Sequence, residues 1–238
     1  MRPIPLLLTA GVAVLLLAPA PALHAAVVVN EVMYHPPSDR DDLQFIELHN
    51  TGPEAVDLAG WKFTKGVECE LPAGLIPAGG FAVVCRDPKA FRRHYGSNVL
   101  AVANFEGRLK HGGERLRLER PDGSIADTFK YLDRSPWPLG PDGYGASLER
   151  RVPGAASDDP ANWGGSALPK ARVAGGTPGA TNSNSAAHVP PQVDTVQFSP
   201  VVPEQPITVT AQVTSAVGIR DVRVHWRSIQ DRNEIGRA

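Results

Sequence analysis

The chain has 238 residues, with 24 lysines and arginines against 25 acidic residues, so its formal charge at pH 7 is −1. A chain so close to neutral is not drawn to nucleic acid or other polyanions by bulk charge, which argues against that class of function. Its 23 glycines and 23 prolines predict many turns and few long helices.

Residues 1–25 have the features of a secretory signal peptide. Arg2 supplies the positive start, residues 4–18 form an apolar run, and small residues follow it. The run is shorter than the ~20 residues that a membrane-spanning helix needs, which favours cleavage over a retained anchor. We therefore expect a secreted chain, extracellular or at the cell surface, with no integral membrane segment and a formal charge of −2 after Arg2 is lost (23 against 25). The candidate cleavage points follow Ala22, Ala25 and Ala26.

Residues 26–180 predict one domain built from short strands separated by turns. Hydrophobic and polar residues alternate in these runs, which are rich in β-branched side chains. We expect eight or nine strands in an all-β, immunoglobulin-like β-sandwich. The expected strands include residues 27–34, 43–50, 81–84, 115–119, 125–131 and 147–150.

One short helix is predicted between Asp87 and Gly96. Asp87 is a suitable N-cap, Pro88 fits the first helical position, and Gly96 is a typical C-terminal stop.

Residues 181–192 have the composition of a linker. We expect three strands after it, at residues 193–198, 207–213 and 219–226, with Trp226 in the centre of a second β-sandwich. A complete immunoglobulin-like domain needs about seven strands and roughly 100 residues. Only 46 residues (238 − 192) follow Gln192. Residues 193–238 are thus expected to be the opening part of a truncated immunoglobulin-like domain.

The two cysteines, Cys69 and Cys85, leave two interpretations open. If residues 67–71 and 81–85 pair as a hairpin centred near Pro77, the two side chains lie opposite each other and a disulfide is geometrically feasible. Alternatively, both are reduced and pack as small apolar residues.

Clustered acids are the best candidate for a metal site. Asp39, Asp41 and Asp42 lie in one loop and offer oxygen ligands for Ca²⁺, although their spacing is not that of an EF-hand and Arg40 lies among them. A solvated loop is the alternative. Glu31 and Glu47 on neighbouring strands form a carboxylate pair, for which we favour a structural role over acid–base chemistry.

Basic residues concentrate around the predicted helix, with Arg92 and Arg93 at its centre. Such a cluster can bind nucleic acid or another anionic polymer. Acidic residues lie among the basic ones, however, so a solvated charged surface is the simpler interpretation. A protein partner can bind an exposed strand edge or the loops at one end of the sandwich. We favour the loops at 35–43 and 132–145, where Trp137 and Tyr144 are expected to be exposed.

Seven short segments occur in a fixed order: VNEV at 29–32, FIELHN at 45–50, VDLAGW at 56–61, IPAGGF at 76–81, GERL at 113–116, DGYGASLE at 142–149 and GTPG at 176–179. Together they resemble the lamin tail domain in the form found on secreted bacterial proteins. The resemblance covers about residues 27–182 and implies an immunoglobulin-like sandwich without catalytic residues, used as an accessory module of secreted hydrolases, nucleases or spore-coat-kinase-like proteins. The segment after the linker resembles immunoglobulin-like or fibronectin-like spacers.

These observations predict a secreted, non-catalytic binding or scaffolding module of a multidomain extracellular protein. We expect no enzymatic activity and no cofactor, and a protein or cell-surface polymer as partner. Two alternatives stay open at this point. The chain can be the N-terminal accessory part of a longer hydrolase or spore-coat-kinase-like enzyme, or a module that binds nucleic acid or another anionic polymer.

Overall fold

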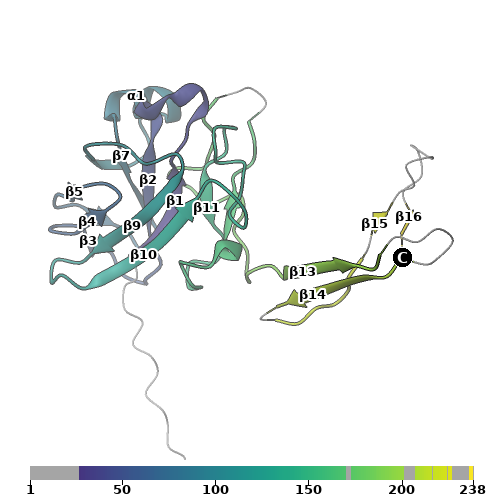
Figure 1. Ribbon diagram of the computed structural model, residues 1–238. Coiled ribbons are helices and arrows are strands. Elements are labelled where there is room, and N and C mark those ends of the chain that lie inside the picture. Colours follow the sequence, from purple (N-terminus) through teal and green to yellow (C-terminus); the bar gives the residue numbers. More distant parts are fainter. Residues whose placement is uncertain are drawn as a thin grey trace, which may run out of the picture.

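A computed structural model of the chain describes residues 27–169, 173–200, 207–215, 217–223, 225–226 and 236–237. The predicted signal peptide, residues 1–25, lies outside these ranges. Two β-sheets pack face to face, and a separate hairpin lies beside them (Figure 1). Within the described ranges, no helix has the length and apolar character needed to span a membrane.

The larger sheet has six strands in the order β12-β11-β1-β2-β7-β8. All neighbouring strands are antiparallel except β7 and β8, which run parallel and are joined through a helix, as parallel neighbours require a crossover. The strands are β1 (Val27–Met33), β2 (Phe45–Asn50), β7 (Phe81–Cys85), β8 (Ala101–Asn104), β11 (Leu148–Arg150) and β12 (Trp163–Gly165).

The smaller sheet has four strands in the order β10-β9-β4-β5. A separate two-stranded sheet pairs β3 with β6, which precede and follow β4 and β5 in the sequence. These strands are β3 (Val56–Asp57), β4 (Lys62–Lys65), β5 (Cys69–Glu70), β6 (Leu75–Ile76), β9 (Gly113–Glu119) and β10 (Ile125–Leu132). The all-β sandwich predicted from the alternating pattern is confirmed.

The main core lies between the two sheets. Alternate residues of each strand point into it, as the two-residue period of a strand dictates. Ile46 and Leu48 of the larger sheet and Leu116 and Phe129 of the smaller one are fully buried there.

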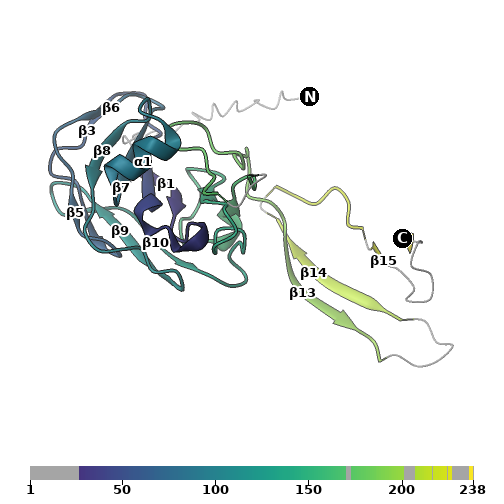
Figure 2. The same cartoon turned by 90° about the horizontal axis from the view of Figure 1, so that it is seen from above.

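The outer face of the six-stranded sheet is also covered, by helix α1 (Pro88–Tyr95) (Figure 2). Asp87 caps this helix by accepting hydrogen bonds from the backbone amides of Lys89 (2.8 Å) and Ala90 (3.1 Å). Gly96 ends it with a φ of +96°, a conformation that favours glycine. The predicted helix and both of its ends are confirmed. Beneath it, Phe91 packs edge-on against Phe45, with ring centroids 5.6 Å apart.

The hairpin that would place Cys69 opposite Cys85 does not form, which leaves the interpretation with two reduced cysteines. Cys69 pairs with Phe63 in the four-stranded sheet, whereas Cys85 pairs with Phe45 in the six-stranded sheet. The two cysteines are therefore on different layers, and both are free thiols. Burial raises the pKa of each thiol to about 11, so neither is a thiolate at neutral pH.

Two parts of the region after residue 158 add to the predicted elements. A strand, β12, and a short 3-10 helix, η3 (Pro160–Asn162), lie after the last of the strands named above. Asn182, Ser183 and Asn184, in the predicted linker, hydrogen-bond to Glu149 or to backbone of the six-stranded sheet. The packing of the first sandwich thus continues into the stretch that we assigned to the linker.

Beyond this stretch, β13 (Gln192–Phe198) and β14 (Val209–Thr214) form an antiparallel hairpin, as predicted. The third predicted strand, 219–226, is reduced to β15 (His225–Trp226), which pairs with β16 (Gly236–Arg237). The side chain of Trp226 lies outside the described residues, so its predicted central position stays a prediction.

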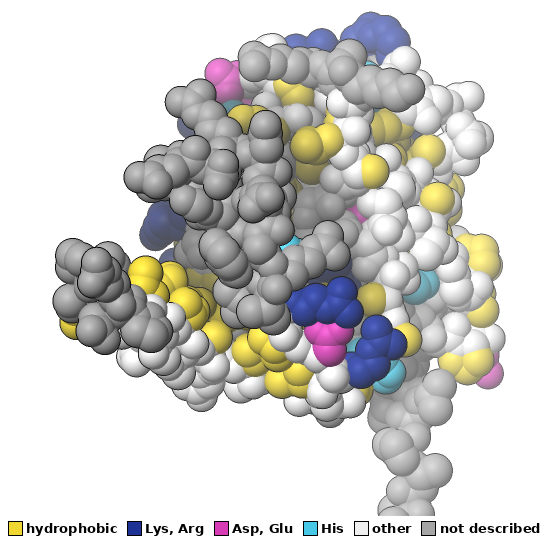
Figure 3. Space-filling model, turned by 90° about the vertical axis from the view of Figure 1, so that its right-hand side faces the viewer, with side chains coloured by type: hydrophobic (Ala, Val, Ile, Leu, Met, Phe, Trp, Pro, Cys, Tyr) yellow, Lys and Arg dark blue, Asp and Glu magenta, His cyan; other side chains and the backbone are white. Residues whose placement is uncertain are grey.

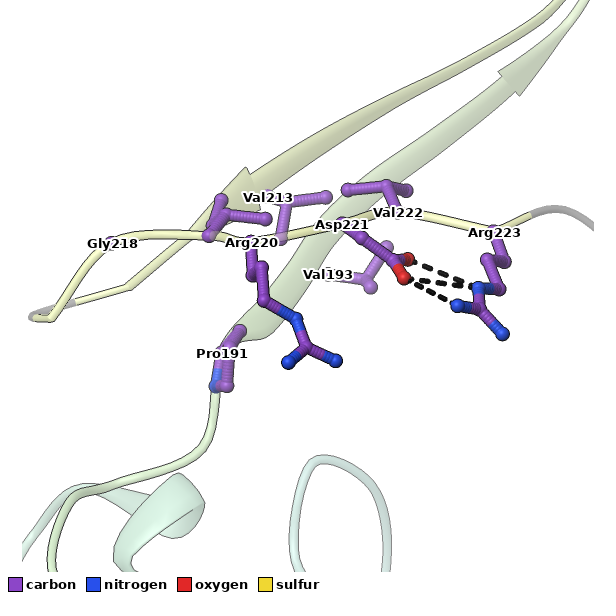
Figure 4. Close-up of a pocket in the computed structure, with 9 residues that line it drawn as sticks. Pro191, Val193, Val213, Gly218, Arg220, Asp221, Val222 and Arg223 are labelled. Atoms are coloured by element: carbon purple, nitrogen blue, oxygen red, sulfur yellow. Dashed lines mark hydrogen bonds and ion pairs between the residues drawn. The ribbon is translucent and has the colours of Figure 1, made fainter.

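Hydrophobic side chains gather on this hairpin, low on the face shown in Figure 3. Val213 and Val222 line an open hollow between the hairpin and residues 218–223, with the Asp221–Arg223 ion pair at its edge (Figure 4). Exposed apolar residues here are Val193, Val196, Phe198, Ile207, Val209, Val217, Ile219 and Val222.

Candidate functional site

The two loops that we favoured for binding lie side by side at one end of the sandwich. Residue His35 and residue Asp142 form an isolated parallel bridge, and the backbone amide of Gly143 donates to the carbonyl oxygen of His35 at 3.1 Å. Gly143 has a φ of +76°, and a Cβ placed there would lie 3.3 Å from the His35 ring. A glycine at this position therefore lets loop 132–145 close onto loop 35–43.

The centre of this end is a group of five side chains that we call the histidine cluster: His35, Asp39, Asp41, His111 and Asp142. The rings of His35 and His111 stack with centroids 3.7 Å apart and planes 9° from parallel. His35 Nδ1 lies 2.6 Å from an Asp142 carboxylate oxygen, and His111 Nε2 lies 2.8 Å from one of Asp41. Asp39 Oδ1 lies 3.0 Å from His35 Nε2 and 3.8 Å from His111 Nδ1.

The three predicted calcium candidates have different surroundings. Asp41 pairs with Arg86 at 3.1 Å, and Asp42 pairs with Arg40 at 2.7 Å. Arg40 also holds the pKa of the Asp42 carboxyl below its usual value by hydrogen bonding and charge. These two carboxylates are thus occupied by arginines, whereas Asp39 faces histidine nitrogens. All three acids line one open hollow together with Arg40 and Arg86, and the predicted Ca²⁺ site there stays a prediction.

Trp137 and Tyr144 have opposite environments. The prediction that Trp137 is exposed is wrong, because its ring is only 5% exposed and stacks near Phe129 and Trp163 in the main core. Tyr144 is 69% exposed, as predicted. Leu139 in the same loop is 59% exposed. The loop therefore presents Tyr144 and Leu139 to solvent while Trp137 anchors it to the sandwich.

Arg92 and Arg93 are exposed in the last turn of α1. Their positive charge is offset locally, because Asp42 is close enough for Arg93 to lower its pKa. Arg108 is also near an acid, 3.7 Å from Asp41. The structure thus shows a surface of mixed charge, which gives the nucleic-acid alternative no specific support.

A second polar group lies on the outer face of the six-stranded sheet. Glu31, Glu47 and Glu149 stand next to one another on β1, β2 and β11, because Glu31 is in register with both of the others. All three are fully buried, and we call them the glutamate row. They lie under residues 173–184, which we call the strap, and α1 holds the strap through a hydrogen bond from Tyr95 to the carbonyl oxygen of Gly175.

Backbone amides and side chains of the strap donate hydrogen bonds to these carboxylates. The amide of Thr177 donates to Glu31 at 2.9 Å, and the amide of Gly179 donates to Glu47 at 2.5 Å. Burial raises the pKa of Glu31 to about 8 and that of Glu47 to about 7, partly because neighbouring glutamate charges repel. Because donors of the fold enclose these carboxylates, the row fastens the strap to the sheet.

A third polar contact joins the two sheets. Arg150 of β11 donates to Asp127 of β10 at 2.5 Å, and both side chains are almost completely buried. Asp127 also accepts a hydrogen bond from the Val29 amide of β1 at 2.9 Å. The Arg150 guanidinium lies over the Trp163 ring, 4.9 Å from its centroid. Like the glutamate row, these residues hold parts of the folded domain together.

Comparison with known families agrees with this architecture. Residues 20–133 match the sequence profile of the Lamin Tail Domain family. The chain contains a lamin tail domain. The family is immunoglobulin-like and non-enzymatic, which agrees with the sandwich and with carboxylates that serve structure. No curated protein matches the chain significantly.

The matched segment holds His35 and His111 but ends before Asp142, Glu149 and the strap. The six-stranded sheet nevertheless includes β11 and β12, so the lamin tail domain of this chain is completed by residues beyond the match. Sequence reasoning did not single out His111, because it lies 76 positions after His35 (111 − 35) and no local spacing links the two.

Proposed function

We propose that this chain is a secreted, non-catalytic binding or scaffolding module whose lamin tail domain binds through its loop end. The chemistry of the exposed side chains fits a protein or a cell-surface polymer as partner. The observation that carries the proposal is the pair Tyr144 and Leu139, 69% and 59% exposed on a loop whose other contacts hold it in place. Large apolar side chains presented on a fixed loop are typical of binding surfaces.

Three contacts support the view that this loop is preorganised. Trp137 is buried in the core, Asp142 binds His35, and Gly143 donates to the His35 carbonyl oxygen. A loop that is already ordered loses less conformational entropy when a partner binds. Arg134 of the same loop is exposed, and so is Lys110, which precedes His111 of the histidine cluster, and charged side chains of this kind form the polar rim of an interface.

The test is retention of the purified chain on the surface of the cells that produce it, measured by quantitative immunoblot after washing. We expect the double variant Tyr144→Ala, Leu139→Ser to reduce retention at least about tenfold, since residues at the centre of an interface contribute about 1–2 kcal/mol or more each. The matched control is Ile125→Ser, which removes a 49% exposed apolar side chain from β10.

Two results would contradict the proposal. One is a wild-type chain that washes off as freely as an unrelated secreted protein. The other is a double variant that is retained as well as the control variant. Unchanged thermal unfolding of all variants would show that the comparison concerns the surface and not the fold.

A further inference from the structure

We propose that His35, His111 and Asp39 form a binding site for a divalent transition-metal ion of the zinc class at the loop end of the lamin tail domain. The inference does not rest on the proposed function, because an ion can bind whether or not a macromolecular partner exists. One donor atom from each of the three residues lies within 4.8 Å of the other two. Two imidazoles and a carboxylate are ligands that zinc uses in proteins.

Each ring has one nitrogen that faces Asp142 or Asp41, which we call the outer nitrogen, and one inner nitrogen that faces Asp39. The partners of the outer nitrogens indicate that the inner ones are available to a metal. Asp142 lies 2.6 Å from His35 Nδ1, and Asp41 lies 2.8 Å from His111 Nε2. A carboxylate only accepts hydrogen bonds, so each outer nitrogen carries the proton. In a neutral ring the inner nitrogen then has a lone pair. Carboxylates that orient metal-ligating histidines in this way are a recurring feature of metal sites.

The inner atoms converge on Asp39. Its Oδ1 lies 3.0 Å from His35 Nε2 and 3.8 Å from His111 Nδ1. Tetrahedral zinc with ligands at about 2.0–2.1 Å separates its ligand atoms by about 3.3 Å, close to both distances. Asp39 is within hydrogen-bond distance of His35 Nε2, so either a proton or a metal ion lies between the carboxylate and the ring. Because the two rings stack 9° from parallel, one of them turns about its side-chain torsions when a single ion binds to both.

The backbone brings Asp39 to this position. Ser38 and Asp39 have φ values of +59° and +52°, a left-handed conformation that is uncommon for residues other than glycine. The turn directs the Asp39 carboxylate back toward the histidines, although 77% of that side chain is exposed. The exposure leaves room for water to complete the coordination.

The ligand set selects the class of metal. Ca²⁺ and Mg²⁺ prefer oxygen ligands, whereas imidazole favours zinc and its transition-metal neighbours. The nearby acids are committed elsewhere, Asp42 to Arg40 and the second oxygen of Asp41 to Arg86. A bound ion would link η1 (Pro37–Asp39) to the turn before β9, and it would stabilise the folded chain by mass action.

The test is isothermal titration of the untagged full chain with Zn²⁺, followed by Co²⁺ titration monitored by visible absorption. We expect saturable binding of one Zn²⁺ per chain, Co²⁺ bands of a low-symmetry four- or five-coordinate site, and much weaker binding of Ca²⁺. Asp39→Ala and His111→Gln should each weaken Zn²⁺ binding at least about tenfold, and Asp142→Asn about 10–100-fold. Asp42→Ala is the matched control, in the same loop and with the same change of charge, and should bind like the wild type.

The proposal is overturned if the wild type shows no one-to-one Zn²⁺ binding. It is also overturned if Asp39→Ala and His111→Gln bind as tightly as the wild type, or if Asp42→Ala weakens binding as much as they do. Asp39 is exposed, so its alanine variant folds and keeps the test valid even if His111→Gln is destabilised. Thermal unfolding without metal identifies any destabilised variant.

Discussion

The glutamate row and the histidine cluster are both groups of acids near β1, yet their surroundings differ. Glu31 lies within β1, and His35 lies two residues after its end. The glutamates are fully buried, and amides and hydroxyls of the strap donate to them. In the histidine cluster, by contrast, exposed Asp39 faces nitrogen atoms that need a proton or a metal between them and the carboxylate.

The comparison shows that the hydrogen-bond donors around a carboxylate determine whether it stabilises the fold or can bind a cation. The number of neighbouring carboxylates matters less. Buried acids whose oxygens already accept hydrogen bonds from the fold contribute to stability, because leaving those donors unpaired is costly. Partly exposed acids that face other electron-rich atoms are suited to bind cations. The predictions below separate these two roles by stability, by pH dependence and by the place where ligands act.

The first prediction compares the buried ring and the exposed ring of loop 132–145, and it concerns the greatest change in the free energy of unfolding. Trp137→Ala removes a ring that is 5% exposed and lies beside Phe129 and Trp163, and we expect a loss of about 3–5 kcal/mol in the free energy of unfolding. Tyr144→Ala removes a ring that is 69% exposed and should change it by no more than about 0.5 kcal/mol. Urea unfolding monitored by circular dichroism measures both, and equal losses would contradict the assignment.

The second prediction compares the loss of stability when one acid is removed from the glutamate row and one from the histidine cluster. Glu149→Ala leaves four hydrogen bonds from Thr177, Ser183 and Asn184 without their acceptor, so we expect a loss of about 3 kcal/mol and faster amide exchange in the strap. Asp39→Ala should cost less than about 0.5 kcal/mol in metal-free buffer. A strap that stays protected in Glu149→Ala would show that the glutamate row does not fasten it.

The smallest effect is a pH dependence. The pKa of Glu31 is raised to about 8 from 4.5, so its protonated form is favoured by folding. Its stabilising contribution is complete below the unfolded pKa and is lost as the pH rises through about 8. Between pH 6.5 and pH 8.5 this amounts to about 1–2 kcal/mol.

The variant Glu31→Gln isolates this contribution. Glutamine imitates the protonated acid and still accepts from Ser147 and Thr177. We expect it to be more stable than the wild type at both pH values, and the difference to be larger at pH 8.5 than at pH 6.5 by about 1–2 kcal/mol, as measured by thermal unfolding at both values. The same difference at both pH values would contradict a raised pKa for Glu31.

Much of the fold could be predicted from local sequence. Alternating residues marked β1, β2, β9 and β10, and the helix was bounded correctly because Asp87, Pro88 and Gly96 are signals that act within a few residues. The choice of sheet for each strand is not local, which is why the sequence left open the hairpin that would place Cys69 opposite Cys85. Trp137 was placed on the surface because a loop sequence does not show what lies beneath it.

The candidate site could be predicted only in part. Loops 35–43 and 132–145 were favoured for binding, and Asp39 was named as a candidate metal ligand, but with Asp41 and Asp42 and not with the histidines. Asp41 and Asp42 adjoin it in sequence, whereas His111 completes the group only because β9 starts beside loop 35–43 in space. The strap was missed for the same reason: glycine-rich sequence predicts a loop and does not reveal which buried acids its amides reach.

The most direct test of this account is a Zn²⁺ titration of the isotope-labelled chain followed by amide chemical-shift mapping. The account predicts shift changes concentrated in loop 35–43, around His111 and in loop 132–145, with the glutamate row and the strap unchanged. Changes centred on Glu31, Glu47, Glu149 and the strap would contradict it, because they would place the cation-binding chemistry in the region that we assign to the fold.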